Sequence, residues 1–452
     1  MKINQSIPAQ PSFKPINMDA FEKRAQNMRE AAAKDEFVPA SENKEKINSF
    51  LGIDRQKAEA LKNPLFDNLA QTHENKRQWT VMLYANGNCD LQDDIEKSVK
   101  DLESVGSDDK ITFLAQLAQS NKDGKAQRMH LKKPSWLGLK NNTETENLGK
   151  TNMAHPQSLK DFVSWGMKKF PAKHYMLILS GHGYGFIGSM PDEQHNDDIL
   201  LTPELKSALD TATKEAGQKI DVVGFDSCLM ANAETAAAIK DSANFMVGSE
   251  EVLFSGNWQH NEFAAKMKEE ANGDGLTVGE TLEAMIRSQN NYMLLSASII
   301  DCRNMPGFID RLKDFSDKLL NTDTSQYEIR RCFRNAQHYC QPNILAMAGN
   351  GGGSTSPMNQ MRDVGSLALE IITNPEVKDS DLKKSALETA KFIKDKAVLF
   401  EMHRKGVNLH ESSGISIYAP IHGSEKFTDF YSRLTLGKET GWDKVIEKYG
   451  SF

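Results

Sequence analysis

The sequence predicts an α/β fold in which a mainly parallel central sheet is covered by helices on both faces. The first observation is an alternation: from Gln78 onward, short apolar runs of strand length are separated by longer runs with helical spacing. Such alternation is typical of parallel sheets packed between helices. The second observation is size and composition, because 452 residues with 39% hydrophobic and 26% charged residues are enough to bury a large core.

Each predicted element is a run of this kind. Seven apolar runs are expected to be strands, at residues 79–85, 111–117, 174–179, 220–225, 244–247, 294–300 and 414–418. Five runs with helical periodicity are expected to be helices, at residues 91–105, 158–170, 203–216, 231–242 and 276–289. In such sheets, ligands and reacting groups gather at the carboxyl ends of the strands, so a functional site is expected there.

Charge and composition exclude several classes of protein. The net charge of −7, from 55 basic and 62 acidic side chains, disfavours a nucleic-acid partner. No apolar run reaches about 18 residues, so no membrane partner is expected. The first residues lack the apolar run of a secretory signal, so the default location is cytoplasmic, with non-classical secretion as the alternative. The five cysteines contain no C-x-x-C pair, so neither a disulfide framework nor a zinc cluster is expected.

Two of the predicted strands end in residues that carry chemistry. The strand at 174–179 runs into a turn in which glycines flank His182, and the strand at 220–225 runs into Cys228, after which a helix is expected at once. If the strands are parallel neighbours, both residues lie at one edge of the sheet. The dipole of the helix would favour a thiolate, and the histidine would supply the proton that a leaving group needs. Backbone N–H groups of Gly183 and Cys228 would hold a developing oxyanion.

The same residues have a simpler interpretation. A cysteine after a strand is more often a small buried apolar residue. A histidine in a glycine-rich turn often only caps or bridges that turn. From placement alone, a Cys–His dyad is therefore the less common outcome, and both interpretations stay open.

Six segments, which occur in order across nearly all of residues 78–452, resemble the clostripain family of cysteine peptidases. They are WTVMLYANGNCDLQDDI, NLGKTNMAHPQSLKDFVSWGMKKFPAKHYMLILSGHGYGF, IDVVGFDSCLMANAE, GSEEVLFSGNW, SGISIYAP and TGWDKVI. This family is grouped with caspases, legumain, gingipains and separase. The resemblance implies a caspase-like α/β sandwich and a cysteine endopeptidase, with His182 as the catalytic histidine and Cys228 as the nucleophile.

The resemblance also bears on the choice of substrate. Family members typically cleave after Arg or Lys, and the aspartate two positions before the nucleophile, here Asp226, lines the pocket for that side chain (S1). A structural role of Asp226 in its turn is the alternative. Where the family often has Gly-Asp-Gly-Trp, this chain has Ser255-Gly256-Asn257-Trp258, so Gly256 replaces a second acidic residue and the preference for basic residues is expected to be weaker.

The first 77 residues differ from the rest of the chain. Residues 1–77 hold one of the 30 glycines and no Trp, Tyr or Cys, which predicts a polar, partly helical extension without a core of its own. Residues 78–452 are expected to form the peptidase domain. Two interpretations of the extension stay open: a pro-segment that covers the cleft until it is removed, or an arm that docks on another protein.

Other features are weaker. No cofactor is expected to be required. The acidic stretch 192–198 offers oxygen ligands for calcium but lacks an EF-hand pattern, so a solvated loop is favoured. The glycine-rich stretch 349–355 lacks a phosphate-binding pattern and is expected to be a flexible loop. Three further cysteines are expected to be packing residues, namely Cys302, Cys332 and Cys340.

Two other classes of function are kept as alternatives. The first is a catalytically silent relative that binds peptides or protein partners in the same cleft. The second is a nucleotide-binding α/β protein, which the sequence disfavours because the turn YANGNCDLQ after the first strand is not G-x-G-x-x-G. The favoured partners are protein or peptide substrates, and the sequence predicts no oligomeric state.

Overall fold

The structure is a computed structural model, and it describes residues 77–134, 142–254, 256–271, 276–289, 295–340, 357–404, 409 and 411–451. All of the extension predicted at 1–77 except its last residue, and the whole of the glycine-rich stretch predicted at 349–355, lie outside the described residues. The first strand of the structure opens at Arg77, one residue before the predicted start of the main domain.

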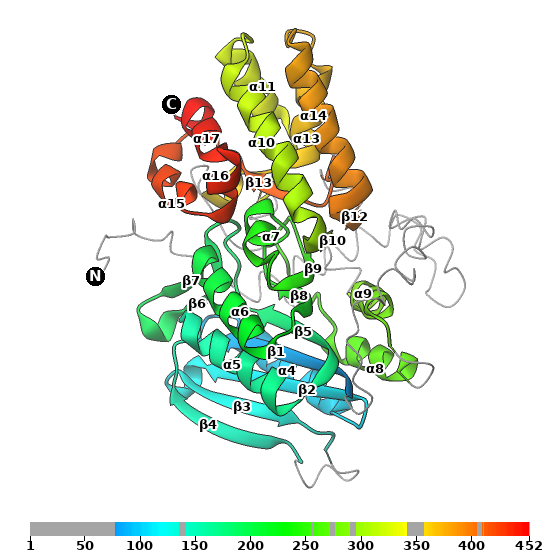
Figure 1. Ribbon diagram of the computed structural model, residues 1–452. Coiled ribbons are helices and arrows are strands. Elements are labelled where there is room, and N and C mark those ends of the chain that lie inside the picture. The colour runs from blue at the N-terminus through cyan, green and yellow to red at the C-terminus, as the bar shows by residue number, and fades with distance from the viewer. Residues whose placement is uncertain are drawn as a thin grey trace, which may run out of the picture.

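A nine-stranded sheet forms the centre of the molecule (Figure 1). Its strands are β1 (Arg77–Gly87), β2 (Ile111–Gln119), β3 (Lys125–Leu131), β4 (Glu144–Lys150), β5 (Ala172–Ser180), β8 (Ile220–Asp226), β9 (Ala243–Gly248), β10 (Ser296–Asp301) and β12 (Val398–His403). Their spatial order is β12-β10-β9-β8-β5-β1-β2-β3-β4. The five strands from β9 to β2 are parallel to one another, whereas the strands beyond them at both edges pair antiparallel.

Helices cover both faces of this sheet. One face packs against α5 (Pro156–Lys169), α6 (Thr202–Ala216) and α7 (Ala233–Ile239), and the other against α4 (Gln92–Val105), α8 (His260–Glu270) and α9 (Val278–Arg287). The alternation of side chains along β1 shows why. Val81 and Leu83 point into one core, whereas Met82 and Tyr84 point into the other, and all four are fully buried. A strand buried on both faces reads as a continuous apolar run, and the predicted α/β fold is confirmed.

The C-terminal part adds a helical layer beyond the sheet (Figure 1). Its helices are α10 (Met305–Asn321), α11 (Gln326–Asn335), α13 (Val364–Thr373), α14 (Ser380–Phe392), α15 (Thr428–Ser432), α16 (Thr435–Thr440) and α17 (Trp442–Gly450). The strand predicted at 414–418 does not join the central sheet, because β13 (Ser416–Tyr418) pairs with β11 (Met361–Asp363) in a separate two-stranded sheet.

The remaining elements are short. A second small sheet pairs β6 (Gly188–Asp192) with β7 (Asp198–Leu201). The short helical segments are η2 (Ser120–Lys122), η3 (Glu193–His195), η4 (Cys302–Asn304), η5 (Pro357–Gln360), η6 (Ile393–Ala397) and η7 (Ser424–Lys426). No helix in the described part of the chain is long and apolar enough to cross a membrane.

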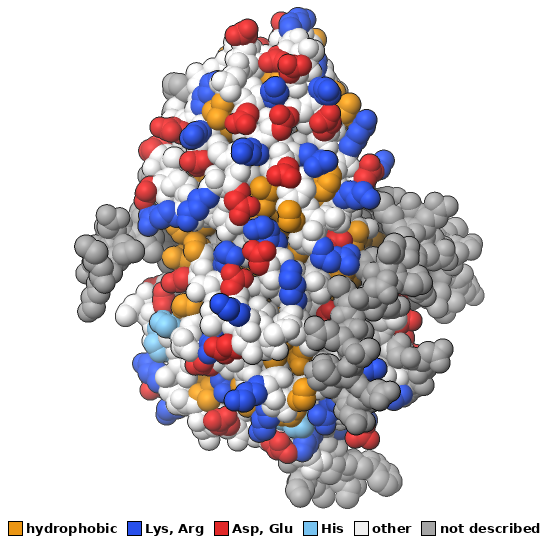
Figure 2. Space-filling view, in the orientation of Figure 1, with side chains coloured by type: hydrophobic (Ala, Val, Ile, Leu, Met, Phe, Trp, Pro, Cys, Tyr) orange, Lys and Arg blue, Asp and Glu red, His pale blue; other side chains and the backbone are white. Residues whose placement is uncertain are grey.

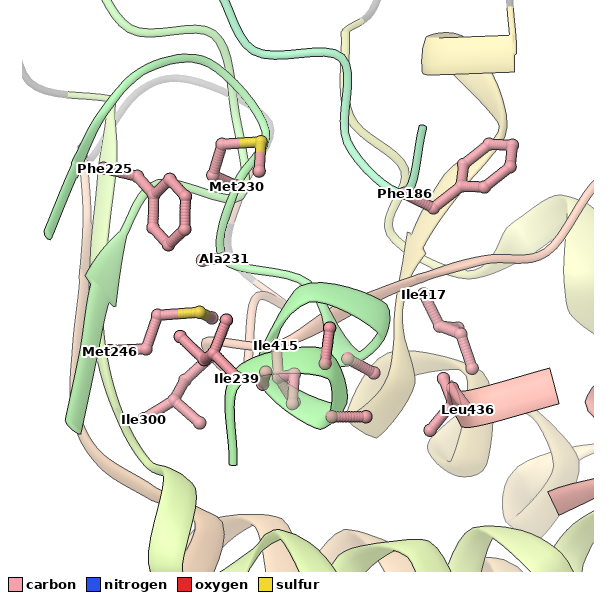
Figure 3. Packing of buried hydrophobic residues seen from close by; sticks show 14 of the residues in the cluster. Phe186, Phe225, Met230, Ala231, Ile239, Met246, Ile300, Ile415, Ile417 and Leu436 are labelled. Atoms are coloured by element: carbon pink, nitrogen blue, oxygen red, sulfur yellow. The ribbon is translucent and has the colours of Figure 1, made fainter. Parts of the chain in front are cut away.

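One apolar cluster joins the sheet to the C-terminal layer (Figure 3). Phe225 at the end of β8 packs in the same cluster as Ile239 of α7, Met246 of β9, Ile417 of β13 and Leu436 of α16. The surface seen in Figure 2 is charged: acidic and basic side chains are interspersed over the C-terminal helices, and no large patch of one sign is visible in this view.

Candidate active site

The turns that carry His182 and Cys228 meet at one edge of the sheet. Strands β5 and β8 are parallel neighbours, with Ser180 opposite Asp226, and each candidate residue lies two positions beyond. Contact between the turns is close: a Cβ on Gly183 would lie 2.2 Å from the carbonyl oxygen of Cys228, which only glycine avoids. The predicted meeting of the two strand ends is therefore confirmed.

Cys228 as a residue is half-buried, and its thiol lies beside the backbone of Leu253. The N–H of Leu253 donates to Sγ at 3.2 Å, and Sγ lies 3.6 Å from the Leu253 carbonyl oxygen. Burial raises the pKa of Cys228 to about 11, and the charges of Glu251 and Asp226 act in the same direction. At neutral pH the resting residue is therefore a thiol, which needs a base to become a nucleophile.

The helix expected directly after Cys228 begins later. Helix α7 starts at Ala233, and Asn232 is its N-cap because its side-chain oxygen accepts from the N–H of Thr235 at 2.8 Å. Between them the chain turns through Leu229, which has a left-handed φ of 63°. The prediction that a helix dipole favours the thiolate is therefore wrong, because Cys228 precedes the first turn of α7.

His182 is held by an acidic residue to which the sequence analysis assigned no role. Nε2 of His182 lies 2.6 Å from Oδ1 of Asp90, in the turn that follows β1. This hydrogen bond is the main cause that lowers the pKa of Asp90, so the carboxyl stays ionised. The site therefore uses the ends of three adjacent parallel strands, β8, β5 and β1.

A second thiol lies near His182. The ligand atoms of Cys89, Asp90 and His182 all lie within 4.8 Å of one another. Cys89 is only 3% exposed, with Sγ 3.5 Å from the carbonyl oxygen of Asn86. Burial raises its pKa to about 12. The thiol of Cys89 thus lies beside His182, whereas Cys228 contacts the His182 turn through its backbone at Gly183.

The N–H groups predicted to bind an oxyanion are available. Within the described part of the chain, neither Gly183 nor Cys228 donates its backbone N–H to another residue. Groups of this kind, fixed beside a nucleophile, stabilise the negative charge that develops on a carbonyl oxygen. The oxyanion hole itself stays a prediction.

Two side chains contact the same carboxylate oxygen of Asp226. Its Oδ2 accepts from the hydroxyl of Ser180 at 3.0 Å and lies 3.1 Å from Nε2 of His260, which is 1% exposed. The side chain of Asp226 keeps 17% of its surface exposed. Gly256, which replaces the second acidic residue of the family, has a φ of 74° and no heavy atom within 4 Å of where a Cβ would be.

The acidic stretch 192–198 folds as the turn between β6 and β7. Asp192 is fully buried, and its oxygens accept from the N–H groups of Met153 and Gln194, the amide of Asn88 and the ring of His195. A solvated loop is thus wrong for Asp192, although Asp198 is exposed. The prediction that Cys302, Cys332 and Cys340 are packing residues is confirmed, since all three are buried.

Comparisons with known proteins identify the family of this chain. The model of the Clostripain family matches residues 93–449. Clostripain of Hathewaya histolytica is 23% identical, over 84% of this chain and 82% of its own. A secreted C11 cysteine protease from Bacteroides thetaiotaomicron, solved with an irreversible peptide inhibitor, has a TM-score of 0.58 and 15% identity, covering 81% of this chain and 99% of its own.

An inactive zymogen of a C11 protease from Parabacteroides distasonis has a similar likeness, with a TM-score of 0.58 and 16% identity over 82% of this chain and 99% of its own. The structures share the caspase-like fold, and the family match spans most of the sequence. The chain belongs to the clostripain family and is a cysteine-type endopeptidase.

Proposed function

We propose that this endopeptidase cuts after arginine or lysine with a Cys228–His182 dyad. The observation that carries the dyad is the pairing of β5 with β8, which presses the His182 turn against the backbone of Cys228. His182 takes the proton from Sγ as sulfur attacks the scissile carbonyl, and the N–H groups of Gly183 and Cys228 hold the oxyanion. The imidazolium then gives its proton to the departing amine, and water hydrolyses the thioester.

Asp90 acts as a positioning residue in this proposal. Its carboxylate engages Nε2 of His182, which assigns the exchange of protons with the thiol to Nδ1. A fixed negative charge beside the ring also stabilises the imidazolium that forms when the thiol is deprotonated. One carboxylate thereby both orients the base and offsets its charge.

Cys228, rather than Cys89, fits the role of nucleophile. Cys228 is partly exposed, lies against Gly183 and follows the strand adjacent to that of His182. Cys89 is almost completely enclosed, and it directly precedes Asp90, whose carboxylate already engages Nε2 of His182. In this proposal a substrate carbonyl meets the thiol of Cys228 and not that of Cys89.

The dyad is tested with the variants Cys228→Ala and Cys89→Ala on a panel of fluorogenic peptides. Cys228→Ala should lose at least about 1,000-fold in kcat/KM, whereas Cys89→Ala should stay close to the wild type. Iodoacetamide labelling read by mass spectrometry should modify Cys228 first. Loss of activity in folded Cys89→Ala alone would make Cys89 the nucleophile, and peptide binding without turnover in the wild type would favour the silent, peptide-binding alternative.

The geometry of Asp226 supports a basic residue before the cut. Ser180 and His260 both engage Oδ2, which leaves Oδ1 for an arginine or lysine of the substrate. Gly256 supplies no second carboxylate. In this proposal the preference for a basic residue before the cut therefore depends on the charge of Asp226. The test is Asp226→Asn: kcat/KM for peptides with Arg at the cut should fall about 10- to 100-fold, and that for peptides with Ala should hold.

Calcium and location stay predictions. The proposed steps use no metal, and the donors that fill the Asp192 carboxylate support a structural role for that residue. Assays with a chelator and with added calcium test the alternative. The relative from Bacteroides thetaiotaomicron is described as secreted, which supports export over the cytoplasmic default. Immunodetection in culture supernatant and cell extract decides between them.

A further inference from the structure

Three side chains of different chemistry, one of them the histidine of the proposed dyad, lie close together. They are the thiol of Cys89, the carboxylate of Asp90 and the imidazole of His182, and their ligand atoms lie within 4.8 Å of one another. In the described part of the chain, this is the one group of three or more His, Cys, Asp or Glu side chains gathered so closely. Cys89 has no role in the proposed reaction.

The donor set fits one kind of cation. Sulfur, nitrogen and oxygen ligands together are typical of zinc, at about 2.3, 2.0–2.1 and 2.0–2.2 Å respectively, which places tetrahedral ligands about 3.5 Å apart. Asp90 and His182 are closer than this, at 2.6 Å, and no pair exceeds 4.8 Å. Small rotations of the side chains are therefore enough to surround an ion. Three protein ligands leave the fourth position to water.

A second acidic residue, Glu193, lies near this group. The Glu193 carboxyl has its pKa raised, first by burial and then by the charge of Asp90. The N–H of Glu193 donates to the carbonyl oxygen of Asn88 at 2.9 Å, which holds this residue beside the β1 turn. A divalent cation would relieve the repulsion between the two carboxylates.

We propose that Cys89, Asp90 and His182 form an inhibitory binding site for a thiophilic divalent cation of the zinc type. Binding replaces the proton of the Cys89 thiol with the metal and releases that proton to solvent. The metal binds Nε2 of His182, so the ring proton moves to Nδ1. Nδ1 can then no longer accept the proton of the Cys228 thiol, and the enzyme is reversibly inactive. The proposal rests on the Cys228–His182 dyad, since it acts by removing one member.

The activity test uses buffered free zinc with three proteins: wild type, Cys89→Ala and the control Cys302→Ala, which removes another buried thiol away from the site. Peptidase activity of the wild type and of Cys302→Ala should be abolished at low-micromolar zinc and return with a chelator. Cys89→Ala should need at least about tenfold more zinc. Equal sensitivity of Cys89→Ala and wild type overturns the proposal.

A second test measures metal binding directly, so it does not depend on peptidase activity, and it includes a control for folding. In Cys228→Ala, Co²⁺ should give a sulfur-to-metal charge-transfer band in the absorption spectrum. The double variant Cys228→Ala/Cys89→Ala should lack this band, while its circular dichroism spectrum shows that it is folded. A band that the wild type shows and Cys228→Ala lacks would mean that the metal binds Cys228, and the proposal fails while the peptidase assignment stands. Inactivity of folded Cys89→Ala without zinc overturns both the dyad assignment and the inhibitory site.

Discussion

Asp90 contacts His182, and removing this contact should lower kcat while it changes KM and stability little. The 2.6 Å contact joins residues that are 92 positions apart in sequence. Asp90→Asn keeps a side chain of the same size but removes the charge that offsets the imidazolium. We expect kcat to fall at least about tenfold with little change in KM or in the thermal midpoint.

Steady-state kinetics and thermal unfolding of the same preparation provide the check. Asp90→Glu, which restores the charge, should recover part of kcat. A change of KM alone, or a large loss of stability, would show that Asp90 has a structural role and does not position the base.

His260 is expected to determine specificity through Asp226. It contacts Oδ2 from a buried position, and its own Nδ1 has no hydrogen-bond partner within the described residues. His260→Ala would free the carboxylate to rotate. The ratio of kcat/KM for Arg over Ala at the cut should then fall several-fold, whereas kcat/KM for the Ala peptide stays unchanged. An unchanged ratio would show that Ser180 alone holds Asp226.

At the scale of elements, the decisive feature is the contact between two turns. Gly183→Ala would place a methyl group 2.2 Å from the Cys228 carbonyl oxygen, so one turn must move. We expect the free energy of unfolding to fall by about 1–3 kcal/mol. We also expect kcat/KM to fall by more than the fraction of unfolded protein accounts for.

The control for this prediction is Gly217→Ala, at the end of α6. Its φ is also positive, at 67°, but no heavy atom lies within 4 Å of the new Cβ. It should cost about 1 kcal/mol of stability and leave kcat unchanged. Denaturant unfolding and peptide hydrolysis measure both. Equal kinetic effects of the two variants would mean that the contact with Cys228 is unimportant.

Elements buried on both faces were predictable from the sequence, and exposed ones were not. The strands β1, β5 and β8 are apolar runs because helices cover both of their faces. Strand β4 reads ETENLGK and is almost wholly exposed at the sheet edge, so it carries no apolar pattern. Helix α10 was not predicted, although its buried residues recur with helical spacing. Such periodicity does not show what covers the apolar face of a helix.

The candidate site shows the same division. His182 and Cys228 follow predicted strands and resemble family motifs, so both were expected at one edge. Asp90 also follows a predicted strand, and the rule of strand ends would have pointed to it. Only the order of the strands, with β1 beside β5, brings its carboxylate to His182, and this order is a property of the tertiary fold.

For the whole molecule, one buried carboxyl connects the sheet layer to the C-terminal layer. Glu234 of α7 accepts from the N–H of Tyr418 and the hydroxyl of Tyr431, both at 2.8 Å. Burial raises the pKa of Glu234 to about 7. The folded protein therefore keeps a proton that the unfolded chain loses near pH 4.5, so the contribution of Glu234 to stability falls as pH rises from about 5 to 7.

The variant Glu234→Gln tests this linkage. It should remove a decrease of roughly 2 kcal/mol in the free energy of unfolding between these pH values, because the amide does not titrate. Glu388→Gln, at an exposed position of α14, should leave the slope unchanged. Urea unfolding at pH 5, 6 and 7 measures all three proteins. A slope that Glu234→Gln does not reduce would contradict the prediction.

The order of the strands also gives the reaction a direction. Neighbouring strands lie about 4.8 Å apart, so a polypeptide laid across this edge meets the turns after β8, β5 and β1 in sequence. On the proposed mechanism, His182 protonates the departing amine. The newly freed amino terminus then leaves over β5 and β1, while the acylated half stays above β8, beside Asp226. The polarity of the cut would be built into the sheet, and rearranging the loops without reordering the strands would not reverse it.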